Sequence, residues 1–189
     1  MRFLNFPARA CLFALASTVI LGACRLKPKV LKSPPHYNFS QVYEEKLDLK
    51  LREISGICWD PKNNFFAAVN DESGTLFLLD KESKQIINEY PFGPKGDYED
   101  VAILNGTIYV LESKGLIIRM QKDSAGDYKG VNVGTVPLNG TNDFETMYGD
   151  PTRKALVILC KNCSEDKENE VNAYAFYPDS IGFDNNRSM

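Results

Sequence analysis

The sequence repeats itself at a fixed interval, and this repetition constrains the fold more than any other feature. Glu53, Glu99 and Glu145 stand 46 residues apart, and each begins a segment that ends in a turn signal. Pro after Asp and Gly after Asn both favour turns. The three turn signals are Asp60-Pro61, Asn105-Gly106 and Asp150-Pro151. The chain is therefore built from repeated units.

Within each unit, short apolar runs alternate with turns. Runs this short, rich in β-branched and aromatic residues and bounded by turn residues, indicate strands. They cover 65–69, 75–79 and 85–90, then 107–111, 116–120 and 128–136, then 155–159 and 171–176. Four short antiparallel strands in a repeat of about 40–50 residues are typical of a β-propeller blade.

We therefore expect an all-β protein, a partial β-propeller over residues 42–184 with about three four-stranded antiparallel blades. The blades are predicted near 53–98, 99–144 and 145–184, followed by a tail at 185–189. Residues 42–51 read as an additional strand, with Tyr43, Leu47, Leu49 and Leu51 on one side. A β-sandwich is the structural alternative, but it does not explain glutamates in register.

Three blades are fewer than a closed propeller needs. Propellers close with about 4–8 blades, and the third unit leaves no room for a fourth strand beyond 181–184. We expect the sequence to be truncated. An open half-propeller and a dimer of two three-bladed halves are the alternatives.

Residues 1–23 have the three parts of a secretory signal peptide: a basic start, a short apolar stretch and small residues before Cys24. The uncharged stretch falls short of the roughly 20 residues that a membrane-spanning helix needs. Leu21-Gly22-Ala23-Cys24 resembles a bacterial lipobox. This resemblance implies that Cys24 carries lipid, palmitate included, and begins the mature lipoprotein. The alternative is an ordinary signal peptide with a chance cysteine.

Residues 24–41 form a basic, proline-containing tether, with four Lys and Arg residues before Pro34-Pro35. Basic residues beside a lipid favour an anionic membrane surface, and prolines stiffen a linker. We therefore expect the protein in the bacterial cell envelope, anchored to the outer membrane or to the periplasmic face of a membrane.

Charge and histidine content exclude several function classes. The formal net charge is −3, which argues against nucleic acid as a partner because phosphate binding needs clustered Lys and Arg. His36 is the single histidine and no Gly-x-Ser-x-Gly occurs, so a Ser-His-acid triad is not expected. We predict no catalytic residues, although enzymatic activity stays open.

Three segments resemble one known family. They are Glu-Ile-Ser-Gly-Ile-Cys-Trp-Asp-Pro from Glu53, Phe-Ala-Ala-Val-Asn-Asp-Glu from Phe66, and Asp-Tyr-Glu-Asp-Val-Ala from Asp97. Together they resemble the SdiA-regulated (YjiK-like) propeller family over about residues 40–180. The resemblance implies about six blades, of which this chain would hold roughly the first half. It implies a fold and a location more than a reaction.

The repeated glutamates are the first candidate site. In a propeller the first strand of each blade lines the channel, so Glu53, Glu99 and Glu145 would form a ring at one mouth. Carboxylates brought together raise each other's pKa or recruit a cation, and oxygen ligands suit Ca²⁺ or Mg²⁺. The alternative is that each glutamate caps backbone N–H groups or pairs across blades. Residues that could join the site are Asn70, Asp71, Glu72, Asp100, Glu112 and Asp143.

Cys160 and Cys163 form a Cys-x-x-Cys pair at a strand end. An exported protein favours a local disulfide. Two idle thiols, a redox pair and a metal site are the alternatives.

Two functions from different classes fit these features. The first is a non-enzymatic envelope module that binds a small molecule, a glycan or a protein. The second is a divalent-metal-dependent hydrolase of the esterase, lactonase or phytase kind, in which the acidic ring holds Ca²⁺ and activates water. A fragment with no function of its own is the third reading.

Overall fold

The computed structural model describes residues 32–41, 43–179 and 182–183. The predicted signal peptide, the lipidation residue Cys24 and the predicted tail lie outside the described residues. The chain divides into two compact units, Met1–Glu44 and Glu45–Met189. In the described part of the first unit, Tyr37 N donates to Pro34 O at 3.1 Å and closes a turn. Within the described ranges, the structure has no helix with the length and hydrophobicity that crossing a membrane requires.

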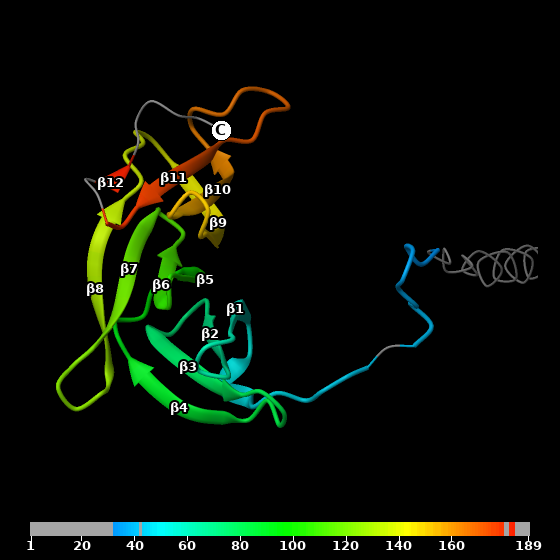
Figure 1. Ribbon diagram of the computed structural model, residues 1–189. Coiled ribbons are helices and arrows are strands. Elements are labelled where there is room, and N and C mark those ends of the chain that lie inside the picture. The colour runs from blue at the N-terminus through cyan, green and yellow to red at the C-terminus, as the bar shows by residue number, and fades with distance from the viewer. Residues whose placement is uncertain (1–31, 42, 180–181, 184–189) are drawn as a thin grey trace, which may run out of the picture. The chain divides into compact units, whose positions relative to one another are not determined.

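The second unit contains three antiparallel sheets of four strands each, and Figure 1 shows them following one another along the chain. In every sheet the spatial order of the strands follows their sequence order. The first sheet holds β1 (Ile54–Asp60), β2 (Phe65–Asn70), β3 (Thr75–Asp80) and β4 (Ile86–Pro91). The second holds β5 (Tyr98–Leu104), β6 (Thr107–Glu112), β7 (Leu116–Lys122) and β8 (Tyr128–Thr135). The third holds β9 (Asn142–Asp150), β10 (Ala155–Cys163), β11 (Ala173–Tyr177) and the short β12 (Gly182–Phe183).

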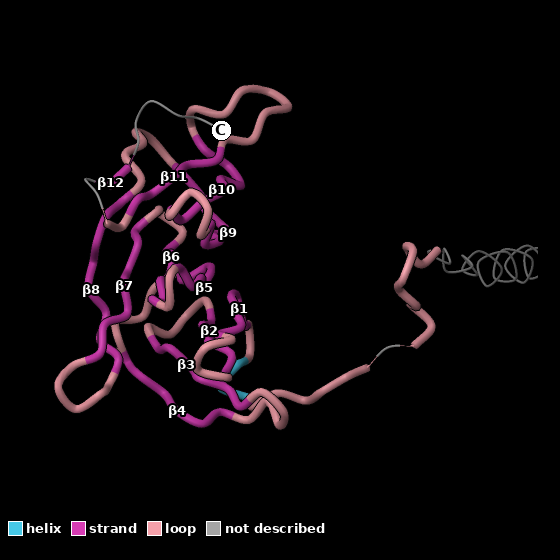
Figure 2. The backbone as a smooth tube through the Cα atoms, in the orientation of Figure 1, coloured by secondary structure: helices cyan, strands magenta, loops and turns pink. Residues whose placement is uncertain are grey.

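The sheets stack like blades about an axis. The first strand of the middle sheet, β5, contacts the first strands β1 and β9, while the last strand β8 contacts β4 and β12. The first strands thus lie innermost and the fourth strands outermost, as Figure 2 lets the reader follow. This arrangement confirms the predicted fold class, an all-β partial propeller with three four-stranded blades among the described residues.

Strand β6 is a continuous apolar run because the middle blade is buried on both of its faces. Successive side chains of a strand point to opposite faces of its sheet. Ile108 and Val110 pack with the first blade, and Tyr109 and Leu111 pack with the third. All four are almost completely buried because this blade is covered on both faces. Burying apolar surface between blades is the main stabilisation available to such small sheets.

The segment before β1 covers the other face of the first blade, but not as a strand. Leu47 and Leu51 pack on Phe77 and its neighbours, whereas Leu49 is 88% exposed. The prediction of a strand at 42–51 is therefore wrong over the described residues. Asp48 accepts a hydrogen bond from Lys50 N and starts the 3₁₀ helix η2 (Leu49–Leu51), which breaks the alternation.

Candidate functional site

A β-bulge interrupts the first strand of each blade at the same place. In β5, Tyr98 pairs with Glu112 and Asp100 pairs with Leu111, which leaves Glu99 as the extra residue. A bulge redirects the side chain of its extra residue and is common near functional sites. The extra residues of the three blades are Ser55, Glu99 and Glu145.

Glu53 is consequently not the structural equivalent of Glu99. The bulge residues Ser55 and Glu99 are 44 residues apart, whereas Glu99 and Glu145 are 46 residues apart, so the spacing of 46 misaligns the first two blades. Glu53 lies just before β1 with a φ of 58°. It precedes the bulge residue by two, as Asp97 and Asp143 do in the other blades. Each blade thus carries an acidic residue two positions before its bulge, whereas the bulge residue itself is acidic only in the second and third blades.

The bulges also tie the blades together. Ser55 Oγ donates to Tyr98 O at 2.6 Å, from the first blade to the second. Asp100 Oδ2 accepts from Met147 N at 2.8 Å, from the second blade to the third, and its Oδ1 accepts from Val101 N at 2.8 Å. Both oxygens of Asp100 are therefore engaged by the backbone. Burial raises the pKa of Asp100, and these two N–H groups oppose the shift.

Three carboxylates gather where β5 and β9 begin. Glu99, Asp143 and Glu145 each offer an oxygen, and these oxygens all lie within 4.8 Å of one another. We call these three residues the carboxylate cluster. The repeat predicts Glu99 and Glu145 for this site, and Asp143 only as a residue that could join it. The structure brings these three together and leaves Glu53 outside.

Crowding changes the protonation of Glu99. Burial contributes most to the shift, followed by a hydrogen bond with Asp97 and the charges of Glu145, Asp97 and Asp143. Together they raise the pKa of Glu99 to about 7. Glu99 therefore exchanges a proton near neutral pH, because burial and nearby like charges both disfavour its ionised form.

Lys161 supplies positive charge to the cluster. Its Nζ pairs with Glu145 Oε1 and lies 3.6 Å from Asp143 Oδ2. The hydrogen bond to Glu145 is the largest cause that raises the pKa of Lys161. Asp97, which shares a hydrogen bond with Glu99, also accepts one: buried Ser113 donates through Oγ to Asp97 Oδ2 at 2.7 Å. One ammonium faces four carboxylates, so the site keeps a negative balance.

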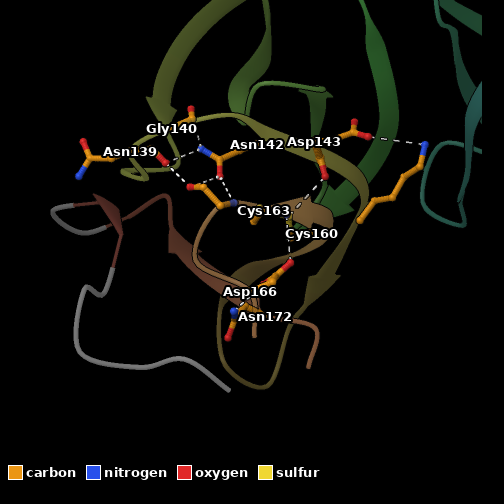
Figure 3. Close-up of a disulfide and its surroundings, with 10 residues drawn as sticks. Asn139, Gly140, Asn142, Asp143, Cys160, Cys163, Asp166 and Asn172 are labelled. Carbon is orange, nitrogen blue, oxygen red and sulfur yellow. Dashed lines mark hydrogen bonds and ion pairs between the residues drawn. A yellow bond between two sulfur atoms is a disulfide. The ribbon is translucent and has the colours of Figure 1, made fainter. Parts of the chain in front are cut away.

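A disulfide joins Cys160 and Cys163 on either side of Lys161. The Cys160 sulfur lies 3.4 Å from the carbonyl oxygen of Asp143, next to the cluster. Asp166 accepts from Cys163 N at 3.0 Å and from Asn172 Nδ2 at 2.5 Å, which orders the start of the following loop (Figure 3). The bonded sulfurs are not thiolates, and thiolates are what a zinc or redox site would use.

Four of the other predicted residues, Glu53, Asn70, Asp71 and Glu72, form a second group in the first blade. Asn70 Oδ1 accepts from Ser73 N at 2.9 Å and from Ser73 Oγ at 2.6 Å, and its amide donates to Lys50 O at 3.1 Å. Asn70 therefore shapes a turn. Glu53, Asp71 and Glu72 lie with it around a hollow of ≈ 460 Å³. Asp71 Oδ1 is buried there and has no hydrogen-bond partner among the described residues.

The carboxylate cluster fits a hard divalent cation. Ca²⁺ binds oxygen at about 2.3–2.6 Å, so two of its ligands lie no more than about 5 Å apart. The three oxygens of the cluster meet this condition. Lys161 would have to leave, because an ammonium and a metal ion compete for the same carboxylates.

Two residues of the site, Lys161 and Asp97, were not predicted from the sequence. Lys161 comes from β10, and only the strand pairing brings it to the cluster. Asp97 could have been found, because Asp97-Tyr98-Glu99 and Asp143-Phe144-Glu145 repeat an acid-aromatic-acid pattern.

Comparison with known proteins shows similarity to solved structures. No family model matches the chain, and no curated protein matches it. Three similar structures are the Myceliophteria thermophila Cps50 (Swd1) β-propeller domain, luciferin-regenerating enzyme and a chain of the nidogen/laminin complex. The identities are 9%, 13% and 14%, with TM-scores of 0.47, 0.46 and 0.46. The matches cover 72%, 65% and 72% of this chain but 44%, 41% and 50% of those chains. The chain therefore spans half or less of each.

Proposed function

We propose that this chain is a binding module of the bacterial cell envelope, related to the SdiA-regulated propellers and anchored by lipid at Cys24. Its ligand is a small molecule, a glycan or a protein that presents a cationic or hydroxyl-rich group. The observation that carries the proposal is the meeting of Glu99, Asp143 and Glu145 within 4.8 Å.

The chemistry of the cluster supports this ligand class. Carboxylates accept hydrogen bonds and attract cations, and charge-assisted hydrogen bonds are the stronger ones. The exposed ion pairs of Lys161 contribute little to stability, so a ligand can displace its ammonium at small cost. The carboxylates lie near the N-terminal ends of β5 and β9. Because hydrogen-bonded strands hold them in place, the site is preformed.

Binding to the full chain tests the proposal. Spermidine serves as a cationic probe and maltotriose as a hydroxyl-rich probe, and isothermal calorimetry measures both. We expect at least one to bind, with affinity lowered about tenfold in Glu145→Gln, since a charged hydrogen bond is lost. Glu168→Gln, an exposed carboxylate in the 164–172 loop, is the matched control and should bind like the parent. Equal losses in both variants, or no binding of either probe, would refute the site.

A second candidate is a divalent-metal-dependent hydrolase, favoured by the raised pKa of Glu99. A group with a pKa of about 7 is suited to accept or donate a proton near neutral pH. Asp143 and Glu145 would hold Ca²⁺, which when bound lowers the pKa of its water, and Glu99 would stay unligated. Glu99 would then exchange a proton beside that water.

Calcium dependence separates the two candidates. For the hydrolase, Ca²⁺ should raise the melting temperature of the full chain, Glu145→Ala should lose this effect, and Glu99→Ala should lose the hydrolysis. Ester hydrolysis, followed with p-nitrophenyl acetate and p-nitrophenyl phosphate, should require the metal. Unchanged melting on addition of a chelator would eliminate the hydrolase and leave the binding module.

The anchor has its own test. Expressed in a bacterium fed a labelled fatty acid, the full chain should become labelled and pellet with membranes. Cys24→Ser should abolish the label and release the chain from the membrane fraction. Label retained in Cys24→Ser would contradict lipidation at this residue.

A further inference from the structure

A cavity lies between the first two blades, away from the carboxylate cluster. Its volume is ≈ 480 Å³, within the usual range of about 300–1,000 Å³ for small-molecule sites. It is lined by the β1–β2 turn at Lys62 and Asn63, the β5–β6 turn at Gly106, and facing residues of β6, β7 and β8. Since Glu99 is near the start of β5 and Gly106 follows its end, the two sites lie at opposite ends of the inner strands.

Three cationic side chains line this cavity. They are Lys62 from the β1–β2 turn, and Arg119 and Lys122 from β7. None of them forms an ion pair with a carboxylate anywhere in the described ranges. Three unpaired cations around one hollow are notable in a chain whose net charge is −3, because nearby acids would ordinarily neutralise them.

Two acids near the cavity, Asp60 and Asp123, are already engaged by other groups. Asp60 is 1% exposed, and its carboxylate accepts from Lys62 N, Asn63 N and Asn63 Nδ2 at 2.9, 3.0 and 2.7 Å. These bonds fix the turn that carries Lys62. Asp123, next to Lys122 in sequence, lies 4.0 Å from Lys129 Nζ and accepts from the N–H groups of Ala125 and Asp127.

We propose that this cavity binds a phosphate group carried by a small molecule or by a lipid headgroup. A phosphate monoester has a charge near −2 and three terminal oxygens, which match several donors on separate elements. The guanidinium of Arg119 offers the planar fork that recognises phosphate, and lysines bind it as point charges.

The remaining lining supports a polar ligand rather than an apolar one. Thr107, Gln121 and Tyr128 add hydroxyl and amide groups to the same hollow. Lys122 Nζ lies 5.0 Å from the centre of the Tyr128 ring, a contact that steadies its long side chain beside the cavity. The site is independent of the carboxylate cluster, so either can fail without the other.

Calorimetric titration of the full chain with inorganic phosphate and with glucose 6-phosphate tests the proposal. We expect saturable binding of at least one, weakened about tenfold or more in Arg119→Gln, because charged hydrogen bonds are lost. Lys62→Gln should weaken it in the same direction. Lys95→Gln removes an equal charge from an exposed loop outside the cavity and should bind like the parent.

Co-sedimentation distinguishes the two sources of the phosphate. The full chain carrying Cys24→Ser, which lacks the proposed lipid, is mixed with vesicles of phosphatidylcholine, with and without phosphatidylglycerol phosphate. Binding that requires the phosphomonoester lipid and falls in Arg119→Gln supports a headgroup as the source. If neither soluble phosphate nor these vesicles bind, or if Lys95→Gln weakens binding as much as Arg119→Gln, the proposal is overturned.

Discussion

Lys161 Nζ lies 3.6 Å from Asp143 Oδ2, and the disulfide between Cys160 and Cys163 closes a short loop around this lysine. The charge that faces the carboxylate cluster is therefore held by a covalent link within β10. Lys161 and Glu145 are both bulged residues, and the neighbouring pairs Cys160–Phe144 and Asn162–Asp143 hold their strands together on either side of Lys161.

Removing Lys161 should make the cluster harder to ionise. In Lys161→Met the carboxylates lose their ammonium, so the pKa of Glu99 should rise further above about 7, by roughly half a unit for an exposed pair. Carbon-13 NMR of the glutamate side chains measures this shift. Lys167→Met, which removes an exposed lysine of the following loop, is the control and should leave the pKa of Glu99 in place. An unchanged pKa in Lys161→Met would contradict the coupling.

Stability should fall as the pH rises through the range set by Glu99. Its pKa is raised from 4.5 in the unfolded chain to about 7 in the folded one, so the folded state binds the proton more tightly. This contribution is fully present below pH 4.5 and is lost as the pH passes 7. Since Glu99 is only partly buried, solvent screening limits the loss to about 1 kcal/mol. Urea unfolding between pH 4.5 and 8 should show it, and Glu99→Gln should remove it; an identical pH profile in both proteins would argue against this role.

Breaking the disulfide should loosen both the fold and the site. The chain-entropy estimate for a four-residue loop gives about 2 kcal/mol, and the measured cost of replacing both cysteines by serine should not exceed this. The same double variant should lower the pKa of Lys161, because its pairing with Glu145 weakens. Urea unfolding and NMR titration check the two effects. If neither changes, the disulfide has no influence on the cluster.

Asp100 should matter for stability rather than for binding. Asp100→Ala leaves Met147 N without its acceptor between the second and third blades, which should cost about 1–3 kcal/mol. Asp100→Asn keeps one carbonyl oxygen and should cost less. Asp127→Asn, in the exposed β7–β8 turn, is the control. Unfolding midpoints measure all three, and a harmless Asp100→Ala would show that the bond between blades contributes little.

Much of the fold could be predicted from the sequence because the residues that mark the strands and turns of each blade are close together in the sequence. Turn residues such as Asn105-Gly106 bound short apolar runs, and the alternation along β6 follows from a blade buried on both faces. Residues 42–51 were predicted wrongly because the apolar spacing there resembles a strand. The spacing carries no information about the capping contact of Asp48 that starts η2.

The site could be predicted only in part. The interval of 46 residues pairs Glu53 with Glu99, but the equivalent bulge residue of the first blade is Ser55, only 44 residues before Glu99. Lys161 reaches the cluster through the pairing of β9 with β10, a contact between residues far apart in the sequence. A pattern within one segment carries no information about contacts between segments far apart in the sequence.

The titration of Glu99 in the full chain tests the central claim most directly, since its pKa is set by burial beside Asp97, Asp143 and Glu145 at the start of β5. Carbon-13 NMR of the Glu99 carboxyl, assigned with Glu99→Gln, gives the value. Burial of Glu99, its hydrogen bond with Asp97 and the nearby carboxylates together predict a pKa of about 7. A value near the ordinary 4.5 would show that the three side chains do not share a site, and the proposed binding function would lose its basis.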